Sequence, residues 1–450
     1  MVAVAVGLDQ PAPPPAPPGL LERVERTASP RARAALVALN LAAVACYLLS
    51  VTGHGVGFGR YRIDLDVYRI GSQVWLRHGA LYGILPLTSS GVRLPYSYPP
   101  IAAVLLAPLS LMPMVVAGVL LTLVSVALTA VVLRVFLRYG AGVRSWWIVG
   151  WLLPVALLLE PVRNTLNYGQ VNILLMALVA ADCLLPNTRW PRGALVGLAA
   201  AVKLTPAAFV LFFLCRGDRR AAGTSVISFA ACTAAGLALD WHDSVRYWTS
   251  VVVRTGRPGS PLFCANQSIQ GVFARAGLDP HSRLGMAAWL AASAVILMLA
   301  WRGMRRARAA SDDAWALSLN AFAALLISPI SWSHHWVWAA PALLLVAVRG
   351  LQDKNRGLLA AALAGLALFA AGPQWWFPHT ENRELHWAAW EQVIGGSYVI
   401  LAAVILLIAA CRQPVARTSG SRAPASRRFR TAAGSPPGRV RAGGLGSAAR

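Results

Sequence analysis

Apolar stretches of about 20 residues recur along this chain, and they constrain its fold more than any other feature, because each is long enough to cross a bilayer as a helix. Hydrophobic residues make up 57% of the 450 residues, and the mean hydropathy is +0.56. Inside lipid, a helix satisfies its own backbone hydrogen bonds within one segment. The sequence therefore predicts an all-α polytopic membrane protein with roughly 10–12 transmembrane or partial helices, and it excludes a soluble globular protein.

Hydropathy, read together with the positions of Arg and Lys, places the individual segments. The expected spans are 34–51, 114–137, 146–160, 169–186, 223–240, 285–302, 314–331, 334–348, 357–372 and 393–411. The apolar stretch before residue 137 is too long for one helix, so we expect a short partial helix over 99–112, which contains Pro108. Residues 193–215 have arginines at both ends, and a re-entrant pair of helices with a hinge at 203–206 satisfies the positive-inside rule.

The same charges predict a multi-pass protein of the plasma membrane with both termini in the cytosol. A disordered arm over 1–33 and a basic, disordered tail over 412–450 then flank a transmembrane domain over 34–411. The tail suits contact with anionic membrane lipids, although a topology signal is the simpler explanation. Loops 52–98 and 241–283 are expected on the external face, together with the active site. The net charge of +24 lies mostly in loops and tail, so it does not predict a nucleic-acid partner.

Asp64 and Asp66 stand out because acids are rare: Asp and Glu together account for 17 of the 450 residues. An acid at a membrane surface must offset its cost of desolvation. As a helix, residues 64–78 place Asp64 one turn from Tyr68 at the level of the lipid headgroups, where a carboxylate can act as general base on an acceptor hydroxyl. The alternative is an interfacial helix whose acids only pair with neighbouring arginines.

A second polar cluster occupies the turn expected at 161–170 and the start of the next span. Arg163, Asn167, Gln170 and Asn172 supply a cation and amides. Amide groups both donate and accept hydrogen bonds, as a site for sugar hydroxyls requires. A polar turn that caps a helix explains the same residues without a ligand.

Lys203 is one of only two lysines, and it lies among apolar residues. A charge there needs an anion or a water-filled cavity. A prenyl phosphate is a suitable partner, since an ammonium stabilises a departing phosphate as its charge builds. The alternative is that the side chain extends to the membrane surface.

His334 and His335 join two expected spans. Adjacent side chains point in different directions on a helix, so a two-histidine metal site is not expected, whereas one imidazole can face a phosphate or an acceptor. Asn266, Gln267 and Ser268 can contact an acceptor or simply make a loop polar. The six cysteines show no CxxC spacing, so no metal site and no cofactor are predicted, and a requirement for a divalent ion is left open.

Several short motifs, taken in order, resemble a known family, the GT87 membrane glycosyltransferases, which are polyprenyl-phosphomannose-dependent α-1,2-mannosyltransferases of actinobacteria with a GT-C fold. The resemblance covers residues 34 to 411. The motifs are Asp64-Leu65-Asp66-Val67-Tyr68, Gly79-Ala80-Leu81-Tyr82, Leu94-Pro95-Tyr96-Ser97-Tyr98-Pro99-Pro100, Gly169-Gln170-Val171-Asn172, Lys203-Leu204-Thr205-Pro206, Asn266-Gln267-Ser268, and the segment from Ser328-Pro329 to His335.

The resemblance implies an inverting transfer of mannose from a β-linked polyprenyl phosphate to a hydroxyl of a lipid-linked glycan. The implied glycolipid acceptor is a phosphatidylinositol mannoside, lipomannan or lipoarabinomannan. Asp64 matches the first-loop aspartate of the family and is implied to be the general base, with Asp66 in reserve. Lys203 and either His334 or His335 are implied to bind the phosphate. Asp66 departs from the family pattern, which does not require an acid there.

Two other functions use the same residues. An arabinofuranosyltransferase that takes decaprenyl phosphoarabinose needs the same groups for its lipid phosphate. A transporter or lipid flippase needs ionisable residues and broken helices near the middle of the membrane, and only Lys203 and its hinge fit that pattern. The sequence does not predict an oligomeric state.

Overall fold

The computed structural model describes residues 29–51, 61–254 and 259–411, and every regular element within these ranges is helical. The predicted all-α class is therefore confirmed. The arm expected over 1–33 and the tail expected over 412–450 lie largely outside the described residues. Of the arm, the residues from Pro30 onward already form the first helix, α2 (Pro30–Val51).

Within the described residues, five helices are long and apolar enough to cross a membrane. They are α2, α5 (Met114–Ala141), α11 (Arg219–Leu239), α14 (Arg283–Ala309) and α17 (Arg356–Ala371). Two bent pairs raise the number to as many as seven: α6 (Trp146–Leu158) meets α7 (Glu160–Tyr168) at 74°, and α18 (Ala389–Gly395) meets α19 (Ser397–Cys411) at 68°. These helices make the chain a multi-pass membrane protein.

Shorter helices complete the bundle. The apolar ones are α4 (Pro100–Ser110), α8 (Asn172–Leu184), α9 (Ala194–Val202), the 3-10 turn η1 (Thr205–Phe209) with α10 (Val210–Arg216), α15 (Asp313–Ile327) and α16 (Ala339–Gln352). The others are α3 (Ile63–Leu76), α12 (Trp241–Arg246), the π-helical turn η2 (Tyr247–Val251), α13 (Ile269–Arg275), and the 3-10 turns η3 (Ser333–Trp338), η4 (Pro373–Trp375) and η5 (Arg383–His386). The partial helix predicted over 99–112 is present as α4, and the helix predicted over 64–78 is present as α3.

One local prediction was wrong. The polar turn expected at 161–170 is mostly a helix, α7, which begins directly after the apolar helix α6. Leu159 is extended and Pro161 occupies the first turn of α7, where a missing N–H costs nothing. The polar residues of this region therefore lie on a rigid helix rather than in a loop.

The chain breaks where it was expected to, at residues 203–206. Lys203 has extended backbone angles, φ −148° and ψ 126°, between the end of α9 and the start of η1. Proline disfavours helical geometry at the residue before it and cannot donate a backbone hydrogen bond. Pro206 therefore gives the break a local cause.

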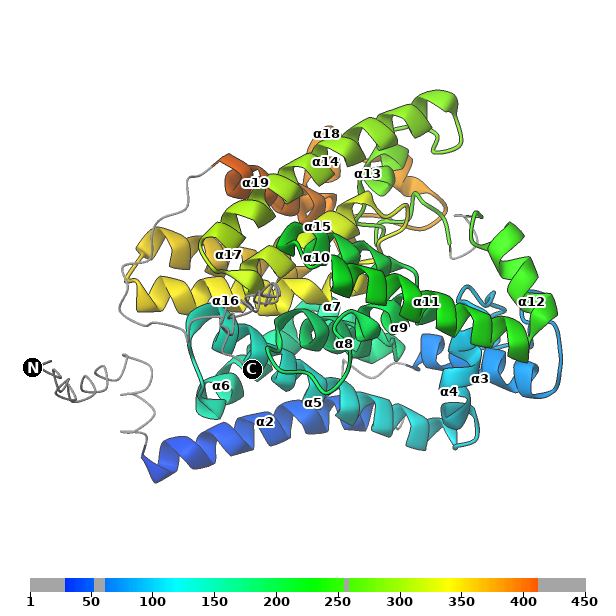
Figure 1. Ribbon diagram of the computed structural model, residues 1–450, viewed down its shortest axis with the longest axis horizontal. Coiled ribbons are helices and arrows are strands. Elements are labelled where there is room, and N and C mark those ends of the chain that lie inside the picture. The colour runs from blue at the N-terminus through cyan, green and yellow to red at the C-terminus, as the bar shows by residue number, and fades with distance from the viewer. Residues whose placement is uncertain (1–28, 52–60, 255–258, 412–450) are drawn as a thin grey trace, which may run out of the picture. The chain divides into compact units, whose positions relative to one another are not determined.

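The core of the helical body surrounds α15. Consecutive residues from Ala314 to Leu326 of this helix, except Trp315, are buried, and it packs against α5, α14, α16, α19 and η1 (Figure 1). A helix that is apolar on all sides belongs in the interior.

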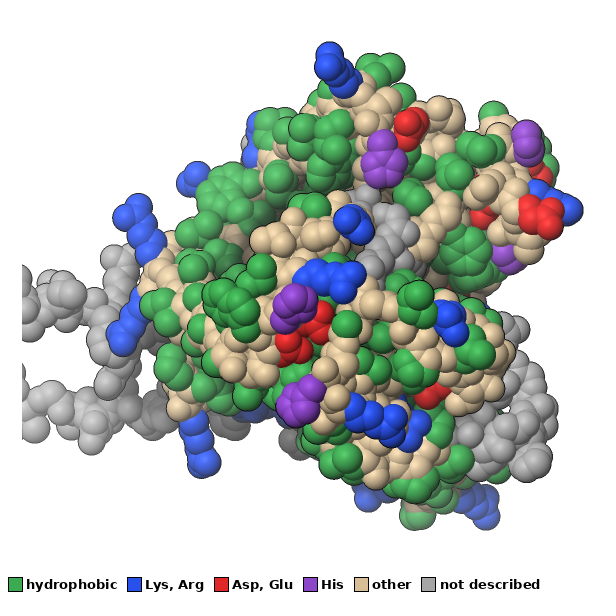
Figure 2. Space-filling model, turned by 90° about the vertical axis from the view of Figure 1, so that its right-hand side faces the viewer, with side chains coloured by type: hydrophobic (Ala, Val, Ile, Leu, Met, Phe, Trp, Pro, Cys, Tyr) green, Lys and Arg blue, Asp and Glu red, His purple; other side chains and the backbone are tan. Residues whose placement is uncertain are grey.

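The two ends of the helical body differ in their elements. In Figure 1, α3, α4 and α12 lie at the right of the view, whereas the turn between α16 and α17 lies at the left. Figure 2 looks onto the end with α3, α4 and α12, and it shows basic, acidic and histidine side chains among hydrophobic ones. The candidate site lies at this end.

Candidate active site

Six of the thirteen predicted site residues line one cavity of about 230 Å³. Its walls come from α3, the segment after residue 93, the turn after α7, the break after α9, η2 and the segment before η3. The lining residues are Asp64, Val67, Tyr68, Leu94, Pro95, Ser97, Tyr98, Pro99, Gln170, Lys203, Leu204, Thr205, Tyr247, Ile330, Trp332, His334 and His335. Residues up to 271 positions apart in the sequence, from Asp64 to His335, thus share one cavity.

Asp64 lies in the first turn of α3, where the positive end of the helix dipole favours a negative charge. The Gln170 side chain hydrogen-bonds to it, and the charge of Lys203 acts on it from across the cavity. Burial nevertheless dominates and raises the pKa of Asp64 to about 6, while the hydrogen bond from Gln170 and the charge of Lys203 oppose that shift. The result is a carboxylate that can accept a proton near neutral pH.

Asp66, two residues further along α3, has a different environment. It is buried and does not line the cavity. Its Oδ2 accepts hydrogen bonds from the backbone N–H of Ser89 at 2.8 Å, from the Ser89 hydroxyl at 3.0 Å and from the Tyr61 hydroxyl, and its Oδ1 lies 3.6 Å from Arg69. These contacts tie α3 to the loop that follows it.

A tyrosine pair orients Gln170. The Tyr68 hydroxyl donates to Gln170 Oε1 at 2.6 Å, and the Tyr98 hydroxyl lies 3.3 Å from the same oxygen and 2.9 Å from the Tyr68 hydroxyl. Because the amide oxygen is occupied by these phenols, the amide nitrogen is the group left to face Asp64. Tyr68 and Tyr98 therefore set the direction of the Gln170 side chain.

Gly169 allows this arrangement. It ends α7 with a φ of +69°, a value that glycine adopts without strain. A Cβ at this position would lie 2.7 Å from Leu65 Cβ and 3.1 Å from Arg62 Cβ. The missing side chain lets the end of α7 approach α3, and so brings Gln170 to Asp64.

Asn167 and Arg163 of the same cluster do not line the cavity. Asn167 is buried, and its backbone carbonyl accepts a hydrogen bond from Arg62 Nη1 at 3.3 Å. Arg163 is partly buried and lies near Glu160 and Tyr47. Of this cluster, only Gln170 lines the cavity, while Asn172 reaches it indirectly through its contact with Lys203.

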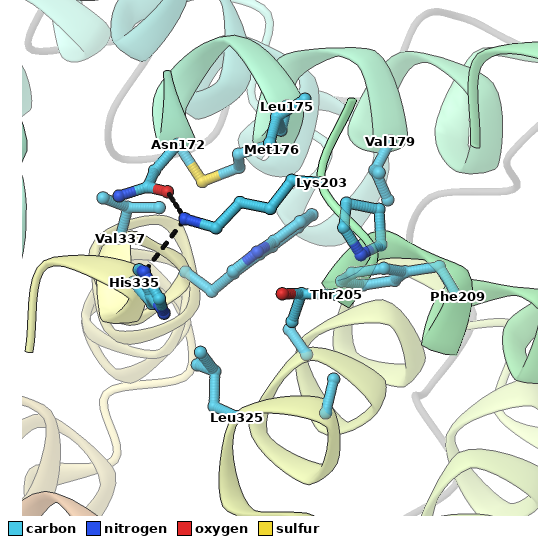
Figure 3. Close-up of a pocket in the computed structure, with 14 residues that line it drawn as sticks. Asn172, Leu175, Met176, Val179, Lys203, Thr205, Phe209, Leu325, His335 and Val337 are labelled. Carbon is cyan, nitrogen blue, oxygen red and sulfur yellow. Dashed lines mark hydrogen bonds between the residues drawn. The ribbon is translucent and has the colours of Figure 1, made fainter. Parts of the chain in front are cut away.

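Lys203 is the cation of the site. Its Nζ donates to Asn172 Oδ1 at 2.9 Å and lies 2.9 Å from His335 Nε2 (Figure 3). It lies in the break between α9 and η1, outside the membrane-spanning helices, and burial lowers its pKa to about 7 while the charge of Asp64 opposes that shift. When Lys203 is charged it donates to His335 Nε2, which leaves His335 neutral with its hydrogen on Nδ1.

A second, smaller cavity of about 40 Å³ lies on the other side of this trio. Lys203, Thr205 and His335 line both cavities, whereas Asn172 lines only the second one, which apolar side chains complete (Figure 3). These include Leu175, Met176, Val179, Phe209 and Leu325. Lys203 therefore lies between two cavities: the larger one, which contains Asp64 and Gln170, and the smaller one, which is mostly apolar.

His334 and His335 lie next to each other, with ring centroids 4.8 Å apart, and both line the cavity. The two rings are nearly perpendicular, at 87°, and the His334 ring meets the edge of Tyr168 at 5.3 Å. The His334 backbone carbonyl accepts hydrogen bonds from Thr165 Oγ1 at 2.8 Å and from Asn172 Nδ2 at 3.0 Å. Asn172 thus joins the backbone at His334 to the ammonium of Lys203.

Asn266, Gln267 and Ser268 are fully buried and do not line the cavity. Asn266 Oδ1 accepts a hydrogen bond from the backbone N–H of Ser331 at 3.0 Å, and the backbone N–H of Gln267 donates to the Ser331 carbonyl at 2.8 Å. The Ser268 hydroxyl caps α13. These residues hold the segment that carries Trp332 into the cavity wall.

Several residues of the cavity wall were not predicted as site residues, among them Tyr98, Thr205, Tyr247 and Trp332. Tyr98, Thr205 and Trp332 each lie within one of the motifs that carry the family resemblance. Tyr247 carried no signal, because a π-helical turn places it in the wall and contacts distant in sequence fix that turn. One of them is the bond from the Leu81 N–H to Asp243 Oδ2, at 2.6 Å.

The described residues hold no group of three or more His, Cys, Asp and Glu side chains that could bind a metal ion. Asp64 faces the cavity and Asp66 faces the loop after α3, so the two acids of the DxD sequence do not converge. The charged groups that line the cavity include the carboxylate of Asp64 and the ammonium of Lys203, which interact electrostatically. They can remove a proton from one reactant and stabilise an anion on another.

Comparison with known proteins identifies the family. Residues 96–329 match the model of glycosyltransferase family 87. A polyprenol-phosphate-mannose-dependent alpha-(1-2)-phosphatidylinositol mannoside mannosyltransferase of Mycobacterium tuberculosis is 38% identical over 81% of this chain and 90% of its own length, and the protein of the same name from Mycolicibacterium smegmatis is 39% identical over 77% and 83%. A corresponding phosphatidylinositol pentamannoside mannosyltransferase of Mycobacterium tuberculosis is 34% identical over 70% and 72%.

No solved structure matches the chain significantly. The match to the first of these relatives extends over 387 residues, and the family match includes Gln170, Lys203 and Tyr247. With more than two thirds of the chain matched at over 30% identity, the chain belongs to glycosyltransferase family 87.

Proposed function

We propose that this glycosyltransferase moves mannose from polyprenyl-phosphate mannose to a hydroxyl of a phosphatidylinositol mannoside, and forms an α-1,2 linkage with inversion. The names of the relatives support the donor, the acceptor and the linkage. The observation that carries the proposal is that Asp64 and Lys203, of opposite charge, line one cavity. Such a pair suits a reaction that removes a proton from the acceptor and releases a phosphate.

Asp64 acts as the general base. An acceptor hydroxyl beside the carboxylate loses its proton to Asp64 as it attacks the anomeric carbon of the mannosyl group from the face opposite the phosphate. Attack from that face converts a β-linked donor into an α-linked product. A base whose pKa is about 6 is ionised at neutral pH and is still basic enough to take the proton. Gln170 keeps the carboxylate in place.

Lys203 and His335 receive the leaving phosphate. The ammonium of Lys203 faces the cavity next to His335, and it stabilises the negative charge that builds on the phosphate oxygens as the bond to the sugar breaks. Asn172 holds the ammonium from behind with its amide oxygen. The neutral His335 ring offers its Nδ1 hydrogen to a second phosphate oxygen.

The remaining predicted site residues have supporting roles in this proposal. Asp66, Asn167 and the segment Asn266, Gln267 and Ser268 hold walls of the cavity through buried hydrogen bonds, and they make no contact with substrate. His334 and Tyr68 face the sugar from the cavity wall. Arg163 does not line the cavity, and its positive charge acts on the carboxylate of Glu160.

The cavity opens to the external side of the plasma membrane, and both termini are cytosolic. Two observations support this orientation. Arginines gather at turns such as that between α16 and α17, which lies at the end of the helices away from α3 and α12 in Figure 1. Soluble nucleotide sugars are cytosolic, so an external site needs a sugar that is carried by a lipid.

A transfer assay with the purified full-length protein tests the function. It supplies radiolabelled polyprenyl-phosphate mannose with a phosphatidylinositol mannoside, and prenyl-phosphate arabinose in a parallel reaction. We expect mannose to appear in an α-1,2-linked product with the mannose donor alone. Transfer of arabinose in place of mannose would identify an arabinosyltransferase. Failure of both donors with well-folded protein would refute the transferase and favour lipid transport.

A further inference from the structure

Glu160 is a fully buried carboxylate that the reaction does not use. It is the first residue of α7, at the 74° bend between α6 and α7, so it lies within a broken membrane span. A charged group in such a place is costly unless the surrounding residues compensate for the lost water. Its presence therefore needs an explanation.

Four side chains from four parts of the chain donate hydrogen bonds to this carboxylate. Its Oε1 accepts from Ser333 Oγ at 2.6 Å, Asn164 Nδ2 at 2.7 Å and Trp375 Nε1 at 2.8 Å. Its Oε2 accepts from the Tyr398 hydroxyl at 3.0 Å. The carboxylate joins α7, η3, η4 and α19 at one point.

This set of donors favours an ionised carboxylate. An ionised carboxylate is an acceptor only, and its two oxygens offer about four lone-pair sites. A protonated acid or an amide carries hydrogens of its own; Asn164 Nδ2 and Trp375 Nε1 cannot accept them, and the Ser333 or Tyr398 hydroxyl could do so only by giving up the bond that it donates. Hydrogen bonds to a charged group are also stronger than those between neutral groups. The charge is therefore what holds the four elements together.

Two walls of the cavity depend on the elements that Glu160 joins. Ser333 directly precedes His334 and His335 in η3. Helix α7, which Glu160 begins, carries Thr165, whose Oγ1 donates to the His334 carbonyl at 2.8 Å, and it ends at Tyr168, which directly precedes Gly169 and Gln170. Glu160 therefore sits where the histidine wall and the Gln170 wall meet behind the cavity.

We propose that Glu160 is a positioning residue, which fixes the two histidines of η3 against Lys203 and α7 through its hydrogen bond from Ser333. One part of this proposal rests on the proposed function: the role of the histidines at the sugar phosphate. The geometric claim, that the Glu160–Ser333 bond holds η3 in place, does not depend on the reaction.

The four donors supply a matched pair of variants. Ser333→Ala and Tyr398→Phe each remove one hydroxyl that donates to the same carboxylate, and both residues are fully buried. Ser333 lies in η3, next to the histidines, whereas Tyr398 lies in α19. If the carboxylate is merely structural, the two variants should change the labelling rate and kcat by similar amounts. If Glu160 positions η3, only Ser333→Ala should change them.

The first measurement follows η3 without using the reaction. Diethyl pyrocarbonate labels accessible imidazoles, and mass spectrometry of the peptide that contains His334 and His335 gives the rate, with the exposed His281 as internal standard. We expect Ser333→Ala to speed labelling about tenfold, the factor that the loss of one hydrogen bond to a charged group gives in a local opening equilibrium. Tyr398→Phe should label at the rate of the unaltered protein.

The second measurement is the transfer assay with the same two variants. Ser333→Ala should lower kcat about tenfold with an unchanged acceptor KM, and Tyr398→Phe should stay within about twofold, even if it lowers the Tm as much or more. For Glu160 itself, Glu160→Asp keeps the charge and should retain more activity than Glu160→Gln, which does not.

The outcomes separate the two proposals. Equal labelling rates in Ser333→Ala and Tyr398→Phe would overturn the positioning role, whatever the activities are. Selective labelling in Ser333→Ala together with an inactive unaltered protein would refute the mannosyl transfer and leave the positioning role standing. Equal losses of kcat that follow the Tm would show that Glu160 only stabilises the fold.

Discussion

The two ends of the helical body use their acids in different ways. Helix α8 connects them, since it begins at Asn172 beside the cavity and ends at Leu184, near Asp182. At that far end Asp182 accepts hydrogen bonds from Trp190 Nε1, Gly193 N–H and Val196 N–H at 2.9–3.1 Å. At the cavity end, none of the ion pairs found among the described residues includes Asp64.

Asp312 and Asp313, which are adjacent in the sequence at the far end, each form ion pairs with arginines. Asp312 lies 2.7 Å from Arg349, and Asp313 lies 2.5 Å from Arg308 and 3.6 Å from Arg216. An acid whose oxygens are all engaged by the protein supports the architecture. An acid that has one amide partner and faces a cavity keeps lone pairs free for a ligand. The number of partners therefore separates structural acids from reactive ones more clearly than burial does.

The largest effect that tests this contrast is expected from Asp64→Asn. An amide cannot take the proton of the acceptor, so kcat should fall about 10²- to 10⁴-fold, while the Tm stays near that of the unaltered protein. The matched control is Asp66→Asn, the same change two residues away in α3. It should lower the Tm through its contacts with Ser89 and Arg69 and cost less than about tenfold in kcat. A larger rate loss in Asp66→Asn than in Asp64→Asn would reverse the two assignments.

The next effect concerns the cation of the cavity. Lys203→Ala should lower kcat/KM for the prenyl-phosphate donor about 10²-fold, because no other ammonium faces the leaving phosphate. Steady-state kinetics with each substrate varied in turn should show an unchanged acceptor KM. Lys354→Ala, at the exposed turn between α16 and α17, is the control and should behave like the unaltered protein. Equal donor kinetics in both variants would remove Lys203 from the phosphate site.

A smaller effect is expected from pH. Burial raises the pKa of Asp64 to about 6, and the base works only when ionised, so kcat/KM should fall as the pH drops below about 6. Burial lowers the pKa of Lys203 to about 7, and the cation works only when protonated, so kcat/KM should also fall above about pH 7. Each limb should approach about tenfold per pH unit in a profile of kcat/KM.

Lys203→Arg tests the alkaline limb. A guanidinium stays protonated throughout the accessible pH range, so this variant should lose the decrease above pH 7 while it keeps the acidic limb. An alkaline limb that persists in Lys203→Arg would mean that another group titrates there.

The smallest effect is expected at the far end. Asp313 is about one third exposed, so the solvent screens its ion pairs, and Asp313→Asn should lower the free energy of unfolding by at most about 1 kcal/mol. Transfer activity should not change. Thermal unfolding together with the transfer assay checks both. A rate loss comparable with that of Asp64→Asn would end the distinction between the two ends.

The sequence predicted most of the helices because lipid leaves a chain few alternatives. Apolar segments of membrane length had to become helices, and Pro206 had to break one of them. The failure at α7 has a similar physical origin: polar residues after a long apolar run were interpreted as a turn, but the bend at Leu159 starts a new helix in another direction. Hydropathy does not report such a change of direction.

The site was only partly predictable. Asp64, Gln170, Lys203 and His335 were found because charged and amide groups are rare in this chain and each needed a reason to be there. The same reasoning also selected Asn266, which the fold uses to bind backbone groups. A sequence does not distinguish a polar side chain that binds a ligand from one that satisfies the protein itself.

Gly169 affects how the results of random mutagenesis should be interpreted. The residue contributes no functional group, yet any larger residue there pushes Leu65, and with it Asp64, away from Gln170. Substitutions at this position should therefore inactivate the enzyme while expression stays normal, the phenotype usually attributed to a residue that touches substrate. A screen for inactive variants would then wrongly count Gly169 among the residues that take part in the reaction.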